Sequence, residues 1–127
     1  MPEKHLYEYA VIRYVPRVER EEFLNVGIVL FSKRGKFIQV KWHIDEQRVK
    51  AFYDQEDVDE LRANLEAFAA IAAGTSKDSR IALMDHTERF RWLTAVRSSA
   101  LQTSRPHPGL CDDLEAALTH LFNELVA

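Results

Sequence analysis

The stretch Leu24–Trp42 constrains the fold of this chain more than any other stretch. Its first part, Leu24–Ser32, is an almost unbroken apolar run between turn residues, which is typical of a strand covered on both faces. Its second part, Lys36–Trp42, alternates apolar and polar residues, which is the pattern of a half-buried strand. Arg34-Gly35 lies between them and marks a turn. The stretch therefore predicts two adjoining antiparallel strands.

A third strand is predicted at Tyr7–Val15, which is rich in aromatic and β-branched residues and stops before Pro16. Ala100–Ser104 is extended in character and offers a fourth strand at an edge of the sheet. Ile81–Met84 has the composition of a brief strand. The segment Arg105–Gly109 contains two prolines and a glycine, so we expect a rigid loop without regular structure there.

The helices are predicted from capping residues and from apolar residues spaced three and four apart. Asp45 can cap a short helix, and a longer helix is expected from near Asp54 to near Gly74. Asp85 with Glu88 has the spacing of a capping box before another short helix. Asp112 stands three residues before Glu115 and opens the closing helix, whose apolar stripe consists of Leu114, Ala117, Leu118, Leu121, Phe122 and Leu125.

These elements predict an α+β fold, with an antiparallel sheet of three to four strands and helices packed on one face. The 127 residues, of which 46% are hydrophobic, match a single domain. Its expected parts are a sheet-forming region (5–43), a helical region (45–74), a region of loop, short helix and edge strand (75–110), and a closing helix (112–126).

The composition argues against several functional classes. The formal charge of −3 gives no global positive field for nucleic acid. The single cysteine, Cys111, forms no intramolecular disulfide and no zinc signature, and we expect neither a metal nor a cofactor. The chain shows no signal-peptide pattern and no apolar run of transmembrane length, so a cytoplasmic protein without membrane contact is expected.

Polar residues that could carry chemistry gather in Arg97–Asp113. In an enzyme, His107 would act as general base, Ser98 or Cys111 as nucleophile and Arg97 as anion clamp. No established catalytic motif accompanies them, and a surface loop with a helix cap explains the same residues. Arg13 is an unusual strand residue, which either pairs with a neighbouring glutamate or contacts a ligand.

Several strings in the chain are distinctive together. They are YEYAVIRYVP at residues 7–16, EFLNVGIVLF at 22–31, RFRWLTA at 89–95, then RS at 97–98, HPGL at 107–110 and DD at 112–113. In these strings the chain resembles a small bacterial family of domains of unknown function. The resemblance implies a cytoplasmic bacterial protein, often encoded beside a HipA-like kinase. The matching polar residues are candidates for binding a ligand or partner, with no catalytic role attached: Arg13, Glu22, Asn25, Arg97, Ser98, His107 and Asp112.

Two functional hypotheses follow. The first is a non-catalytic protein-interaction module, accessory to a HipA-like kinase, which predicts an exposed apolar patch or an open strand edge. The alternative is an enzyme or binding protein acting on a phosphorylated or nucleotide-like ligand. That alternative requires Arg13, Arg97 and His107 to converge in one concave pocket.

Overall fold

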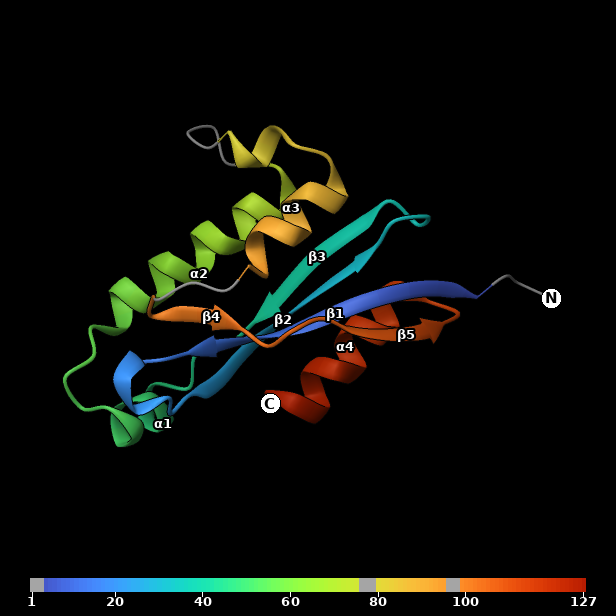
Figure 1. Ribbon diagram of the computed structural model, residues 1–127. Coiled ribbons are helices and arrows are strands. Elements are labelled where there is room, and N and C mark those ends of the chain that lie inside the picture. The colour runs from blue at the N-terminus through green and yellow to red at the C-terminus, as the bar shows by residue number, and fades with distance from the viewer. Residues whose placement is uncertain (1–3, 76–79, 96–98) are drawn as a thin grey trace.

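A computed structural model describes residues 4–75, 80–95 and 99–127, and a twisted antiparallel sheet lies at its centre (Figure 1). The elements in chain order are β1 (His5–Tyr14), the 3₁₀ turn η1 (Val18–Arg20), β2 (Leu24–Ser32), β3 (Phe37–Trp42), α1 (Glu46–Phe52), α2 (Val58–Ala73), the 3₁₀ turn η2 (Ile81–Leu83), α3 (His86–Leu93), β4 (Leu101–Thr103), β5 (His107–Cys111) and α4 (Leu114–Leu125). The α+β class is confirmed.

The sheet has five strands, and β1 is the strand that most of the others meet. The order is β3-β2-β1-β4, and β5 also pairs with β1. Residues His5–Tyr9 of β1 pair with β5, and Ile12–Tyr14 of the same strand pair with β4. The two short strands therefore share one edge of β1, and β2 occupies the other edge.

Ser104 closes the gap between β4 and β5. Its backbone N–H donates to the carbonyl oxygen of Val11, and its hydroxyl Oγ accepts a hydrogen bond from the Val11 N–H, both at 2.9 Å. Ser104 is only 5% exposed. Since a buried backbone N–H needs a partner, this side chain replaces the missing strand partner at Val11.

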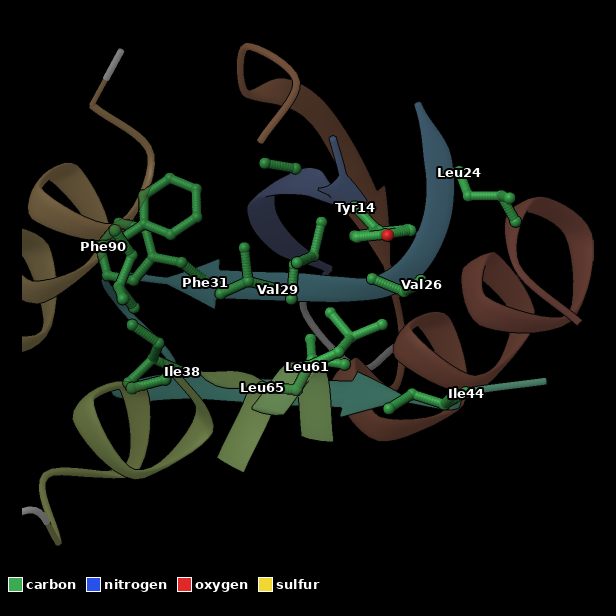
Figure 2. Close-up of a cluster of buried hydrophobic side chains, with 14 of the residues drawn as sticks. Tyr14, Leu24, Val26, Val29, Phe31, Ile38, Ile44, Leu61, Leu65 and Phe90 are labelled. Atoms are coloured by element: carbon green, nitrogen blue, oxygen red, sulfur yellow. The ribbon is translucent and has the colours of Figure 1, made fainter. Parts of the chain in front are cut away.

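Two apolar clusters cover the two faces of the sheet. On one face, residues of α2 and α3 share an apolar cluster with Ala10, Ile12 and Tyr14 of β1, and Figure 2 shows Tyr14 in this cluster with Leu61 and Leu65 of α2 and Phe90 of α3. On the other face, α4 packs on Val11 of β1 and on Ile28 and Leu30 of β2, and Figure 1 shows α4 below the sheet with α2 and α3 above it. The expectation of helices on one face is therefore wrong, because the apolar residues of β2 alternate between the two faces and both need cover.

The strand predictions have mixed outcomes. β2 spans the predicted residues, β4 confirms the edge strand, and β1 and β3 differ from their predicted bounds by one or two residues. The loop expected at 105–109 is partly wrong, since β5 begins at His107. β5 lies at the edge of the sheet. Proline is tolerated there, because an edge strand has no neighbouring strand on one side that would need the N–H that Pro108 lacks. The strand expected at Ile81–Met84 is also wrong, since a 3₁₀ turn forms there.

Each α-helix begins directly after an aspartate whose carboxylate accepts a hydrogen bond from a free N–H group in the first turn. Asp45 and Asp85 cap α1 and α3 as predicted. α2 begins later than expected, because Asp57 rather than Asp54 accepts hydrogen bonds from its first turn. The predicted Asp112 cap is wrong as well, since the carboxylate of Asp113 accepts from the Ala116 N–H at 3.1 Å. Among the helices of the described ranges, none has the length and apolarity needed to cross a bilayer.

Candidate functional site

Arg13 lies on β1 where the pairing with β2 is irregular. It stands opposite Asn25, and a β-bulge at this point leaves Val26 as the extra residue. The guanidinium carbon of Arg13 lies 4.0 Å from the centre of the Phe23 ring, a cation–π contact. Its Nε is buried and has no hydrogen-bond partner within the described residues. Among the described residues, Arg13 therefore does not form the predicted ion pair with a glutamate.

Asn25 links β2 to the end of α4. Its Nδ2 donates to the carbonyl oxygen of Leu125 at 3.1 Å, so it satisfies one of the free carbonyls in the last turn. Its Oδ1 is buried without a partner in the described residues. Arg13 and Asn25 are thus cross-strand neighbours that leave one buried donor and one buried acceptor without a partner among the described residues.

Glu22 belongs to an exposed pair at the same end of the molecule. Its carboxylate pairs with Arg20, and both side chains are more than half exposed. They border a hollow of 220 Å³ that Phe52 and Tyr53 also line. An exposed pair of this kind contributes at most ~1 kcal/mol to stability. Glu22 therefore provides surface charge at this hollow.

His107 and Asp112 lie at the two ends of β5. His107 stands opposite Tyr9 of β1, and the two ring centres are 5.3 Å apart. Both His107 and Asp112 are exposed. Asp112 borders a hollow of 370 Å³ together with Tyr7, Cys111 and residues of α4. His107 pairs with Tyr9, which precedes Arg13 by four residues on β1. At the usual rise of a strand, this separation is about 13 Å along β1.

The candidate residues therefore form separate groups. Arg13 and Asn25 are neighbours at one end of the sheet, whereas His107 and Asp112 lie beside the other half of β1. Arg97 and Ser98 lie outside the described residues. The enzyme hypothesis needs one concave pocket, but neither Arg13 nor His107 is among the described residues that line the 220 Å³ hollow or the 370 Å³ hollow.

Cys111 is not activated as a nucleophile. Burial raises the pKa of its thiol, and the nearby carboxylates of Asp112 and Asp113 add to this effect, although a hydrogen bond from the Asp113 backbone opposes it. The thiol therefore stays protonated near neutral pH, whereas the thiolate is the reactive form. Across the described ranges, no group of three His, Cys, Asp or Glu side chains is arranged to hold a metal ion.

A second kind of surface lies between the start of β1, the β2–β3 turn and α3. It is a groove of 630 Å³, which we call the basic groove. Its lining includes four cationic residues and the side chains of Phe31 and Phe90: Lys4, Lys33, Arg34, Arg91, Phe31 and Phe90. The two phenylalanine rings stack with their centres 4.9 Å apart, and they lie close together in Figure 2.

Comparison with known proteins identifies the family. Residues 9–126 match the family described as Protein of unknown function (DUF3037). The chain belongs to this family. The resemblance to a family of domains of unknown function is thereby confirmed. Searches of curated proteins and of solved structures returned no match.

In this DUF3037 chain, the basic groove is the feature that the sequence patterns missed. The sequence patterns predict a turn at Arg34-Gly35 and place Arg91 in the family string RFRWLTA, but they assign no site to either residue or to Lys33. The cations come from three segments that are distant in the sequence, so no local motif marks them. Leu6 was also missed, although it lines the groove and is 62% exposed.

Proposed function

We propose that this DUF3037 protein is a non-catalytic protein-interaction module of the bacterial cytoplasm. The observation that carries the proposal is a pair of exposed leucines on the sheet. Leu6 of β1 and Leu110 of β5 are directly opposite each other and are 62% and 63% exposed. Contiguous apolar surface of this kind is typical of a site that another molecule covers.

The partner would cover the face of the sheet rather than extend the β5 edge. Leu6 lines the basic groove, which continues the apolar surface of the leucine pair towards α3. Along β5, Pro108 lacks the N–H that an added strand would need. A partner that places side chains on Leu6 and Leu110 avoids that obstacle.

The alternative function, an enzyme or binding protein for a phosphorylated or nucleotide-like ligand, has weaker support. It relies on Arg13 and His107, whose positions on the sheet are about 13 Å apart along β1. The raised pKa of the Cys111 thiol also disfavours nucleophilic catalysis. The observation in its favour is that Arg13 Nε and Asn25 Oδ1 have no hydrogen-bond partner among the described residues, but both atoms are buried.

A HipA-like kinase is the partner that the family resemblance suggests. The test is affinity capture of the tagged protein from its native host at endogenous expression, followed by mass spectrometry of proteins and small molecules. A stoichiometric HipA-like kinase is the expected result. The Leu6→Ser/Leu110→Ser variant should lose this kinase, because serine removes the exposed apolar surface.

The matched control is Leu83→Ser. Leu83 is 84% exposed and lies on η2, outside the lining of the groove, so its replacement should leave capture unchanged. Recovery of a nucleotide or phosphorylated metabolite without any protein would contradict the proposal and support the alternative. In that case Arg13→Ala, Arg97→Ala and His107→Ala would test the ligand site.

A further inference from the structure

The basic groove carries charge of the opposite sign to the whole chain. Among the described residues of its lining there are four cations and one carboxylate, that of Glu8, whereas the chain as a whole has a formal charge of −3. Within the described residues, Lys4, Lys33, Arg34 and Arg91 form no ion pair. By contrast, three other arginines are paired with glutamates, namely Arg17, Arg20 and Arg62. The groove therefore presents uncompensated positive charge.

The wall formed by the β2–β3 turn is held in place by Ser32. The hydroxyl of this buried residue donates to the carbonyl oxygen of Leu6 at 2.9 Å and accepts from the Gly35 N–H at 3.2 Å. It thus connects β1 to the turn that carries Lys33 and Arg34. A surface that is already ordered loses less conformational entropy when a partner binds.

The opposite wall, α3, is fixed by Arg89. Its Nε donates to the carbonyl oxygen of Ala72 at 3.3 Å, and its Nη1 donates to that of Met84 at 2.6 Å. Ala72 lies in the last turn of α2, where a cation also interacts favourably with the helix dipole. Arg91, two residues along α3, is therefore presented from a helix that is anchored to α2.

We infer that the basic groove binds an acidic segment of a protein partner, in which carboxylates flank an apolar side chain. This inference rests on the proposed function and specifies the chemistry of the partner. The apolar side chain would contact Leu6, the strongly exposed apolar residue of the lining. The carboxylates would pair with the cations on the two walls, since arginine can bind a carboxylate through two parallel hydrogen bonds.

The apolar part of the groove favours a peptide over nucleic acid. Single-stranded nucleic acid binds through bases that stack on exposed aromatic faces. Phe31 and Phe90 are 6% and 2% exposed, so their ring faces are not open to a base. The third aromatic residue of the lining, Tyr7, is half-buried and its ring lies against Gly109. Leu6, the strongly exposed apolar side chain of the lining, is aliphatic. An aliphatic surface beside cations suits a leucine or phenylalanine in an acidic peptide.

The test uses the ¹⁵N-labelled full chain and two short synthetic peptides. In one peptide leucines alternate with glutamates, and in the other lysines replace the glutamates. The glutamate peptide should shift the backbone amide signals of Lys33, Arg34 and Arg91, and its affinity should fall as salt rises. The lysine peptide should cause no shifts in these amides.

Charge reversal supplies the matched comparison. Arg34→Glu/Arg91→Glu should weaken binding of the glutamate peptide by at least about tenfold, because two attractions become repulsions. Arg17→Glu should leave binding unchanged, since Arg17 is an exposed cation at the other end of β1. Thermal unfolding of each variant checks that it folds. If the double variant does not fold, the salt dependence and the lysine peptide still decide the question.

Four results would overturn the inference: equal binding of both peptides, amide shifts confined to other surfaces, tighter binding of oligodeoxythymidylate at the same amides, or shifts that depend on protein concentration without peptide, which would indicate a second copy of the chain. The proposed function fails separately. If Arg34→Glu/Arg91→Glu still captures the same partner from the host, the acidic-segment inference is wrong and the interaction module stands. If no partner is captured at all, the proposed function itself fails.

Discussion

Replacing Ser104 with alanine tests how the edge of β1 is completed. Ser104→Ala removes the hydroxyl that accepts a hydrogen bond from the Val11 N–H at 2.9 Å. Val11 is 8% exposed, so water does not readily replace the lost acceptor. The neighbouring backbone hydrogen bond, from the Ser104 N–H to the Val11 carbonyl oxygen, remains available in the variant.

The expected loss follows from leaving one buried donor unpaired. Such a group costs about 1–3 kcal/mol of the free energy of unfolding. The unfolding entropy is ~2.1 cal/mol/K per residue, summed over 127 residues. Each ~1 kcal/mol lost from the free energy of unfolding therefore lowers the melting temperature by ~4 °C. Ser104→Ala should therefore melt about 4–11 °C below the wild type.

Thr103→Val is the matched control. Thr103 precedes Ser104, and its Oγ1 is also buried but has no hydrogen-bond partner within the described residues. Removing this hydroxyl should leave the melting temperature unchanged or raise it. Urea unfolding and hydrogen exchange at the Val11 amide measure both variants. Equal losses in the two variants, or unchanged exchange at Val11 in Ser104→Ala, would refute the role assigned to Ser104.

Three further predictions concern the helices and β1. Leu118→Asp should lower the free energy of unfolding by ~3–5 kcal/mol, because an unpaired charge enters the cluster beneath the sheet; an unchanged thermal midpoint would show that α4 does not pack there. Asp113→Ala should cost about 1 kcal/mol in urea unfolding through loss of the α4 cap. Asp112→Ala should change stability by less than ~0.5 kcal/mol, and the reverse order would restore the cap expected from the sequence. Burial and the hydrogen bond to Glu56 raise the pKa of Tyr14 above its usual 10.0, so its contribution to stability is complete below pH 10 and is lost as the pH rises above it. Wild-type stability should therefore fall more steeply above pH 10 than that of Tyr14→Phe, and parallel unfolding curves would contradict this.

The fold class could be predicted because local patterns carry it. The β2 run and the apolar stripe of α4 are visible in the sequence, and both elements form where they were expected. The sequence analysis did not predict that α4 covers the opposite face from α2 and α3, although the unbroken apolar run of β2 already requires cover on both faces. β5 was missed for another reason: Pro108 and Gly109 oppose a strand locally, and only pairing with β1 overrides that preference.

The candidate site was less accessible to sequence reasoning. Register pairing makes Arg13 and Asn25 neighbours, but their relation depends on the bulge that skips Val26. The basic groove depends on three segments that meet only in the folded chain. Individual exposed lysines and arginines are ordinary on any surface. These four cations indicate a binding site only because the fold brings them to one groove and because no carboxylate among the described residues pairs with them.

The position of β1 has a consequence for synthesis of the chain. Val11 and its partner Ser104 are separated by 93 residues. At ~5–20 residues per second, the ribosome needs about 5–20 s to make the segment between them. During that interval β1 can pair with β2 while its other edge stays open, and an open edge is a template for strands of other chains. Translational pauses before β4 should therefore increase aggregation of nascent chains, whereas pauses after β5 should not.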